Sequence, residues 1–261
     1  MQRTAKKRFI FKRSYYIKKA VKILVAVLVL IFILTSVVKI NGDYVFRYSA
    51  KITIEQCTDE DAGKLTHMPF LRELCLLGCQ TDNLDFLTDM PRLQEIYINS
   101  LNNNYDLSFL ESCTELREFR SGGFTFDDLT CFSKMNKLEE LDLGLFVVNN
   151  IQSLEGLDKL TSLKRLYLSA LNENAETELI NSLTGLESLW ITDSDFEFLE
   201  ISAPNLNYLN ISDNPNLKNV ILNGDFDSLE MLVIDDSPNI VFSQLPEFPA
   251  LKILCVSQGQ I

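Results

Sequence analysis

Eight side chains suited to molecular recognition are spread through this sequence at nearly regular intervals. Six occupy the centre of a short stretch whose neighbours are mostly apolar, and two others precede such a centre by two residues. The eight are Tyr97, Arg120, Asp142, Arg165, Tyr167, Trp190, Tyr208 and Asn210. Tyr, Trp and Arg most often supply the binding energy at interfaces. We predict a binding surface here; the competing interpretation is that large side chains simply cover a sheet.

Residues suited to catalysis are scarce by comparison. His67 is the only histidine, and it lies in the segment THMPF without a nucleophile motif around it. The sequence contains neither the G-x-x-x-x-G-K-[ST] phosphate loop nor the H-E-x-x-H zinc motif. Paired carboxylates serve glycoside hydrolases, but a chain with 36 acidic residues offers such pairs by chance. We predict no catalytic residues and no enzyme activity, and a carboxylate enzyme is the weakest hypothesis.

Two pairs of cysteines could form disulfides. Cys57 and Cys79 are 22 residues apart, close to the interval at which a short apolar strand recurs in this sequence, so they occupy equivalent positions in two adjacent repeats. Neighbouring strands lie about 4.8 Å apart, which suits the Cα separation of a disulfide. A bridge in an oxidising exterior and a pair of buried thiols both remain open. Cys113 and Cys131 lie in neighbouring units but at different positions, which makes them a weaker candidate pair.

A metal or cofactor site is not expected. Cys75 and Cys255 share one position but lie eight units apart, so they cannot pair within one molecule. Cys75 and Cys79 lack the second Cys or His pair that zinc needs. The acidic loop Thr58–Gly63 has too few ligands at the right spacing for an EF-hand, which leaves calcium there as a weak alternative.

A short repeated strand must position all of these side chains. The segment LNYLNISDN, Leu206–Asn214, has the L-x-x-L-x-L-x-x-N pattern of a leucine-rich repeat. Its fourth and sixth positions are apolar in every unit except at Ser121. The first position recurs every 20–25 residues, at Leu71, Leu93, Leu116, Leu138, Leu163, Leu186, Leu206, Leu229 and Leu251. Because side chains alternate along a strand, the residue between positions four and six points away from the core.

The segment LEGLDKLTSLKRLYLS, Leu154–Ser169, resembles the leucine-rich repeats of bacterial internalin-like proteins, and the resemblance covers residues 52–261. It implies an α/β-type curved solenoid with a parallel β-sheet on its concave face and a role in binding. Asn fills the ninth position only at Asn214. Elsewhere this position holds Cys79, Leu101, Phe124, Phe146, Leu171, Ser194, Ser237 and Gly259. We therefore expect a less regular turn than in typical members.

Charge divides the chain into two parts. Residues 1–42 carry ten of the 24 basic residues and none of the 36 acidic ones. The remainder is strongly acidic, which disfavours nucleic acid as a partner, because phosphates need Lys and Arg.

The apolar run between these parts predicts a membrane anchor. Residues 20–40, AVKILVAVLVLIFILTSVVKI, would as a helix cross a bilayer core of about 30 Å. We predict a basic cytoplasmic tail at 1–19, a transmembrane signal-anchor helix at 20–40 and a juxtamembrane linker at 41–48. The positive-inside rule places the repeats outside the cell membrane. A cleaved signal peptide is the alternative, but LTSVVKINGD offers no small-x-small cleavage site.

The solenoid itself is expected over residues 49–261, as a capping strand at Lys51–Cys57 followed by about nine repeats. Its far end lacks an obvious polar cap. There the residues Leu251, Leu254, Val256 and Ile261 would leave an apolar edge.

We predict a membrane-anchored, extracytoplasmic binding protein that recognises a protein or glycan ligand through its concave face and uses no cofactor. The alternative is a structural or assembly protein that self-associates through its C-terminal end.

Overall fold

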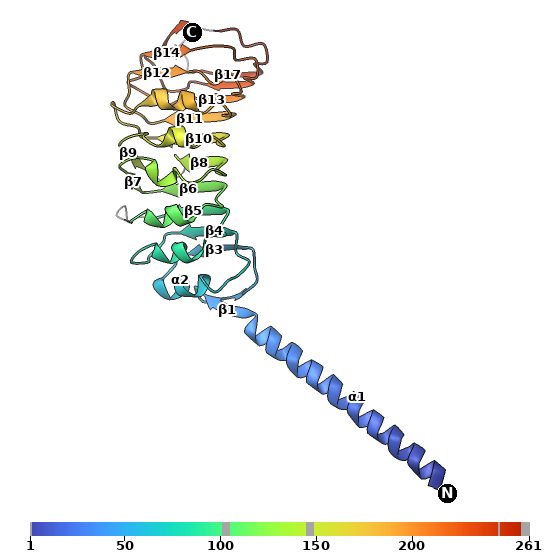
Figure 1. The fold of residues 1–261 in the computed structure, drawn as a ribbon. Helices are drawn as coiled ribbons and strands as arrows, with labels where there is room; N and C mark the ends of the chain where they lie inside the picture. Colours follow the sequence, from blue (N-terminus) through green and yellow to red (C-terminus); the bar gives the residue numbers. More distant parts are fainter. Residues whose placement is uncertain (1, 101–104, 145–148, 245, 257–261) are drawn as a thin grey trace.

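The computed structural model describes residues 2–100, 105–144, 149–244 and 246–256. Figure 1 shows a stack of similar coils from which one long helix extends at the N-terminal end. The predicted residues Leu101, Phe146, Gly259 and Ile261 lie outside the described ranges.

A ten-stranded sheet runs the length of the solenoid, and neighbouring strands in it pair in parallel. Its strands, in chain order, are β3 Lys51–Glu55, β4 Glu73–Leu77, β5 Glu95–Asn99, β6 Glu118–Gly122, β8 Glu140–Leu143, β10 Arg165–Ser169, β11 Ser188–Thr192, β13 Tyr208–Asn210, β15 Met231–Val233 and β17 Ile253–Cys255. The curved solenoid with a parallel sheet on its concave side is therefore present.

The return leg of each coil forms the opposite side. Short 3-10 helices occur there at Asp85–Asp89, Ser108–Ser112, Thr130–Phe132, Leu157–Lys159 and Thr177–Ser182. Two smaller parallel sheets complete this side, formed by β7 Thr125–Phe126 with β9 Asn150–Ile151, and by β12 Phe198–Ile201, β14 Asn219–Leu222 and β16 Val241–Gln244. Parallel strands stack because every coil makes the same turn.

A continuous apolar core lies between the two sides. The leucines at the first repeat position are at most 3% exposed from Leu71 to Leu229. One coil alone would leave its leucines in water, so stability depends on stacking of neighbours. Phe119 and Phe132, which lie on opposite sides of one coil, are in contact at a ring-centroid distance of 5.2 Å.

The N-terminal segment departs from the prediction. Helix α1, Gln2–Thr35, ends before residue 40, and Val37–Ile40 forms strand β1, which pairs antiparallel with β2, Asp43–Phe46. The turn between them is Asn41-Gly42, with φ values of 47° and 85°, as expected for a tight hairpin. The helix therefore ends five residues before the predicted boundary at residue 40, and a strand occupies part of the predicted linker at 41–48, because Asn-Gly after a β-branched run favours a hairpin.

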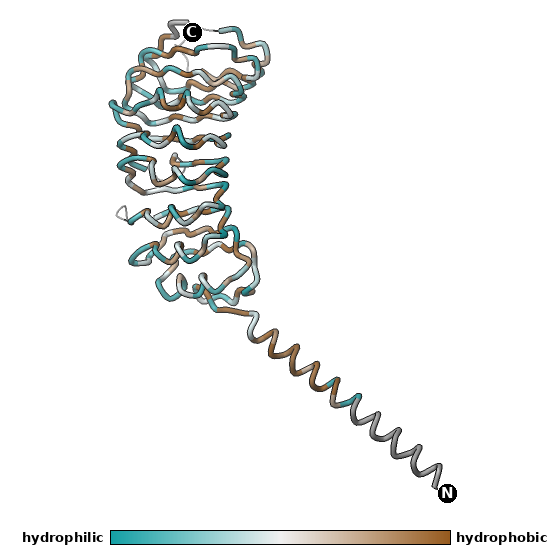
Figure 2. The backbone as a smooth tube through the Cα atoms, in the orientation of Figure 1, coloured by the Kyte–Doolittle hydropathy of each residue, from teal (hydrophilic) through white to brown (hydrophobic). Residues whose placement is uncertain are grey.

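The residues of α1 nearest the solenoid are mostly apolar, as the brown hydropathy colouring in Figure 2 shows. Their side chains are exposed to solvent. None of the described helices combines the length and apolar character needed to cross a membrane.

The hairpin packs against the first coil. Ile40 is 2% exposed in the solenoid core, and Asn41 donates from its backbone N to Asp61 Oδ1 at 2.9 Å. Asp61 belongs to α2, Asp59–Leu65, whose N-cap is Thr58. The predicted acidic loop is thus the first turn of a capped helix. Within the described ranges, no group of three or more His, Cys, Asp or Glu side chains is placed to hold a metal ion.

The last coil is less covered than the others. Ile253 and Leu254 of β17 are 48% and 50% exposed, and Leu251 and Val256 are half-buried. β17 has one neighbour in the described sheet, β15.

Candidate functional site

The solvent side of the main sheet carries two columns of side chains set by strand register. The central column is the third residue of each strand: Thr53, Cys75, Tyr97, Arg120, Asp142, Tyr167, Trp190, Asn210, Val233 and Cys255. The flanking column lies two residues earlier: Lys51, Glu73, Glu95, Glu118, Glu140, Arg165, Ser188, Tyr208, Met231 and Ile253. All eight predicted residues belong to these columns.

Three aromatic side chains meet on β10, β11 and β13, and we call Tyr167, Trp190 and Tyr208 the aromatic patch. The Tyr167 and Trp190 rings are perpendicular with centroids 4.5 Å apart, and Trp190 and Tyr208 are 5.2 Å apart. All three are half-buried. Burial raises the pKa of Tyr167 and Tyr208, so both hydroxyls stay protonated at neutral pH. The aromatic patch is a continuous surface of ring contacts that also carries the Tyr hydroxyls and the Trp N–H, a combination typical of interfaces.

Next to the aromatic patch, Asn210 is oriented by its own turn. Its side-chain Oδ1 accepts a hydrogen bond from the backbone N of Ser212 at 2.9 Å. This bond holds the amide at the edge of the patch, half-buried beside Trp190.

Two arginines and two glutamates form a charge cluster at the centre of the face. Arg120 Nη2 lies 2.7 Å from Glu140 Oε1 and 3.2 Å from Glu118 Oε2. Arg165 pairs with Glu140 through Nε and lies 3.5 Å from Glu118. Glu140 is only 4% exposed, so its charge depends on both guanidinium groups. Arg165 therefore turns toward the glutamates, although its position flanks the aromatic patch.

Asp142 is the exception to the predicted exposure. It is 0% exposed, and all four residues of β8 are buried. Its Oδ1 accepts a hydrogen bond from the backbone N of Gly144 at 3.0 Å. The prediction that Asp142 lines the open surface is wrong, because its neighbours in the central column, Arg120 and Tyr167, are much longer and enclose it.

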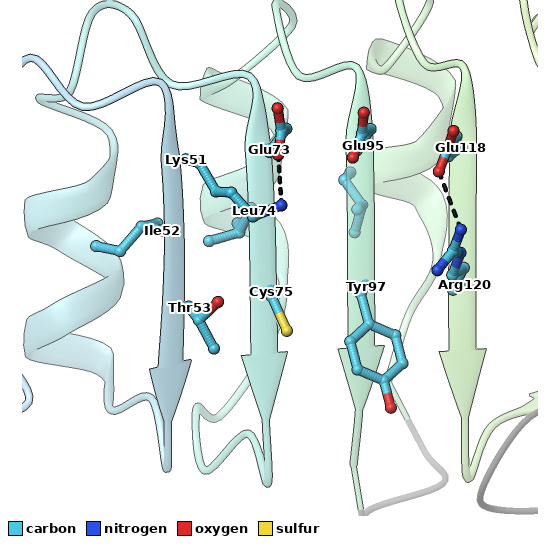
Figure 3. A pocket seen from close by; sticks show the side chains of 11 residues that line it. Lys51, Ile52, Thr53, Glu73, Leu74, Cys75, Glu95, Tyr97, Glu118 and Arg120 are labelled. Atoms are coloured by element: carbon cyan, nitrogen blue, oxygen red, sulfur yellow. Dashed lines mark hydrogen bonds and ion pairs between the residues drawn. The ribbon is translucent and has the colours of Figure 1, made fainter.

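A shallow cavity of about 300 Å³ lies at the N-terminal end of the face, and Figure 3 shows its side chains. Lys51 and Glu73 pair at 2.7 Å on one side, and Arg120 and Glu118 pair on the other. Between them, Glu95 makes no ion pair with any described residue. We call this cavity, lined also by Tyr97 and Cys75 among others, the acidic pocket.

The negative charge of the acidic pocket affects the pKa of Glu95. Partial burial raises the pKa of its carboxyl group, and the neighbouring carboxylates of Glu118 and Glu73 raise it further. A cationic group placed here would relieve that repulsion. The binding-site prediction named Tyr97 and Arg120 but omitted Glu73, Glu95 and Glu118, whose position two residues earlier in each strand was the signal that could have found them.

The turn that follows each strand is held by buried polar side chains. Asn214 donates to the carbonyls of Ile191 and Ile211 at 2.8 and 2.9 Å and accepts from the backbone N of Ser194 at 3.0 Å. Asn149 makes the same set of contacts with Leu143, Ser121 and Phe124. Because this unit is longer, Asn149 lies three residues beyond the ninth position, so counting from the leucines misses it.

The six cysteines are unbridged in the structure. Cys57 and Cys79 are buried side by side, whereas Cys75 and Cys255 lie in the central column. Burial raises the pKa of Cys113 to about 11 and that of Cys131 to about 12. The lone His67 is exposed and its Nδ1 lies 3.0 Å from the Gly63 carbonyl, which fits a local structural contact.

No protein-family model and no curated protein sequence matches this chain. Among solved structures, internalin C2 from Listeria monocytogenes aligns with a TM-score of 0.56 and 18% identity over 77% of this chain and 86% of its own. A second Listeria internalin and a leucine-rich repeat protein from Leptospira interrogans each align with a TM-score of 0.45, at 16% and 14% identity. They cover 82% and 81% of this chain, and 89% and 73% of their own. The likeness to internalin C2, together with the ten-stranded parallel sheet, shows that this chain has the leucine-rich repeat solenoid fold of the internalins.

Proposed function

We propose that this protein binds a protein partner through its concave face, with the aromatic patch as the anchor. The observation that carries the proposal is the contact of Trp190 with Tyr167 and Tyr208 on the open side of the sheet. Trp and Tyr at the centre of a rigid surface offer large contact area at little cost in conformational entropy. The backbone beneath them is held by ladder pairing on both sides.

The acidic pocket lies on the same face, four strands from Trp190, and it supports a more specific description of the partner. A Lys or Arg side chain of the partner would place its charge beside Glu95 and its methylene groups against Tyr97. The exposed Asp193 and Asp213 favour the same charge near the aromatic patch. We propose a partner that presents an apolar group and a cationic group on one surface.

The test is a pair of variants with a matched control. The partner is first captured from cell extracts with the wild-type protein, identified by mass spectrometry and purified. Replacing Tyr167 and Trp190 by Ala should weaken its affinity at least about 30-fold, because each is expected to contribute about 1–2 kcal/mol or more. Phe198, an exposed aromatic residue of β12 outside the main sheet, serves as the control, and F198A should leave affinity unchanged.

Retention of full affinity by the double variant, with the wild-type circular dichroism spectrum, would rule out the aromatic patch as the anchor. Binding of a wall polysaccharide in place of any protein would support the glycan alternative.

We further propose that α1 attaches the solenoid to a membrane with the repeats on the extracytoplasmic side. Apolar side chains from Val21 to Leu34 are about half exposed around the whole helix, and a helix that is apolar on all sides needs an apolar environment. Near the C-terminal end of α1, the Phe32 ring stacks on Tyr48, which also contacts Phe46 and Phe70. Aromatic side chains therefore gather where the helix meets the solenoid, as is typical of a membrane interface. The basic residues in the N-terminal half of α1 favour a cytoplasmic N-terminus.

Membrane attachment can be tested in intact cells. The protein should remain with membranes after alkaline carbonate extraction, and external protease should digest the solenoid. Release of the protein by carbonate, or protection of the solenoid from protease, would contradict the attachment or its orientation respectively.

Assembly through the C-terminal end is the second candidate function. The exposed Ile253 and Leu254 on the edge strand β17 favour it, because such an edge can pair with another chain. Light scattering during size-exclusion chromatography should show a concentration-dependent dimer that I253K abolishes. A monomer at every concentration would exclude self-association.

A further inference from the structure

Cys57 and Cys79 occupy the same turn in the first two coils. Cys57 lies two residues beyond Glu55, and Cys79 lies two residues beyond Leu77, the partner of Glu55 in the β3–β4 ladder. The backbone N of Gln80 donates to the carbonyl of Cys57 at 2.9 Å, which holds the two turns together. Both side chains point into the core and are 0% and 6% exposed.

The two thiols contact each other, and their surroundings make them chemically unequal. A hydrogen bond from Cys57 lowers the pKa of Cys79, and contacts with Thr81 assist, including its hydroxyl 3.2 Å from the Cys79 sulfur. The same contact and burial raise the pKa of Cys57. One member of the pair is therefore suited to attack as a thiolate while the other keeps its proton.

We propose that Cys57 and Cys79 form a site of covalent modification, an intramolecular disulfide that closes the first coil onto the second. The oxidant is a low-molecular-weight disulfide. The Cys79 thiolate attacks one of its sulfurs, which forms a mixed disulfide and releases one thiolate. Cys57 then loses its proton and attacks the Cys79 sulfur, releasing the second. The protein gives up two electrons and two protons, and one small disulfide becomes two thiols.

A disulfide at this location would stabilise the N-terminal end of the solenoid. The end of a stack frays first, because its last coil has a neighbour on one side only. Cys57 precedes Thr58, the N-cap of α2. Asp61 of α2 accepts a hydrogen bond from the backbone N of Asn41, in the turn of the β1–β2 hairpin. Tyr105 reinforces the adjoining turn, since its hydroxyl donates to the Thr81 carbonyl at 2.9 Å. A bond between the cysteines therefore joins the whole N-terminal cap to the second coil.

The other cysteines provide internal controls. Burial raises the pKa of both Cys113 and Cys131, and Cys75 and Cys255 lie at opposite ends of the sheet. The raised pKa of Cys75, Cys113 and Cys131 disfavours attack by these thiols, so they should stay reduced under conditions that oxidise the pair.

The experiment uses the full chain in detergent, incubated with excess oxidised glutathione at neutral pH and mapped by mass spectrometry without reduction. We expect a peptide that joins Cys57 to Cys79 with the loss of two hydrogens, and a melting temperature at least 5 °C higher than that of the reduced protein. The C57S variant should show no such rise, whereas C113S should behave as the wild type.

The wild-type protein alone also decides the matter, so a variant that does not fold does not weaken the test. After incubation, unfolding and alkylation with iodoacetamide, recovery of Cys57 and Cys79 as alkylated thiols would overturn the proposal. Recovery of one of them as a stable glutathione adduct, with the other alkylated, would overturn it equally.

Discussion

The two halves of the concave face use the same backbone for different surfaces. From β3 to β8 the flanking column is one lysine followed by four glutamates, and Arg120 and Arg165 are drawn into pairs with them. From β11 to β17 the same column holds Ser188, Tyr208, Met231 and Ile253, with Trp190 at the centre. The change from charge to aromatic contact takes place at β10.

This difference shows which positions of a coil are free to vary. Outward-facing side chains can change from ionic to aromatic because each contacts mainly its neighbours along the column. The turn after the strand has a different requirement, since its buried carbonyls and N–H groups need partners, which Asn or Ser side chains supply in several coils. Asn149 serves that need in the charged half, and Asn214 serves it in the aromatic half.

Loss of the turn asparagines should have the largest effect and should not distinguish the halves. N149A and N214A each remove three hydrogen bonds to buried backbone groups, and we expect each to lower the free energy of unfolding by about 4 kcal/mol. Urea denaturation followed by circular dichroism measures the change. The exposed Asn174 is the control, and N174A should cost less than about 0.5 kcal/mol. A cost at Asn149 far below that at Asn214 would show that the two turns are not equivalent.

The next effect belongs to the charged half alone. E140Q leaves Arg120 and Arg165 without their shared carboxylate, and we expect a loss of about 2 kcal/mol, less than for fully buried pairs because both arginines are partly exposed. Y208F in the aromatic half removes only a hydroxyl tip and should be close to neutral. If E140Q were also neutral, the charge cluster would not stabilise the fold.

Trp190 should show the complementary behaviour. W190A removes two aromatic contacts and should cost about 1.5 kcal/mol. We expect this cost to be the same at 0.1 M and 1 M sodium chloride, because contacts between uncharged aromatic rings are not screened by salt. For K51A in the charged half the cost should be small and should decrease at high salt, since Lys51 is exposed. A strong salt dependence of the W190A effect would contradict the division of the face.

The smallest effect concerns Glu95 and depends on pH. Folding raises the pKa of this carboxyl group. The folded protein therefore binds the proton more tightly than the unfolded chain, and stability falls as pH rises through that pKa. E95Q should be more stable than the wild type at pH 7 by less than about 1 kcal/mol, and the difference should vanish below about pH 4. E178Q, at an exposed site on the opposite side of the solenoid, is the control variant for these measurements.

Sequence reasoning located the strands and both columns because leucine spacing is a local signal that one coil repeats in the next. Strand alternation also assigns Tyr167, Trp190 and Tyr208 to the outward side of neighbouring strands. It missed Asn149, which lies in a longer unit whose extra residues displace the turn. Hydropathy does not reveal the hairpin after α1, because the mostly apolar run continues through Ile40. The turn dipeptide Asn41-Gly42 is the sequence signal that indicates it.

What the sequence determined by itself is the repeat, its inward leucines and the outward identity of each column, since all three follow from backbone periodicity. Tertiary structure decided which outward side chains stay accessible and how charges pair. Asp142 is buried by longer neighbours, Glu140 draws in two arginines, and Glu95 forms no ion pair with any residue that the structure describes. These outcomes depend on side-chain length and on the stacking of coils more than 20 residues apart, which no single stretch of sequence contains.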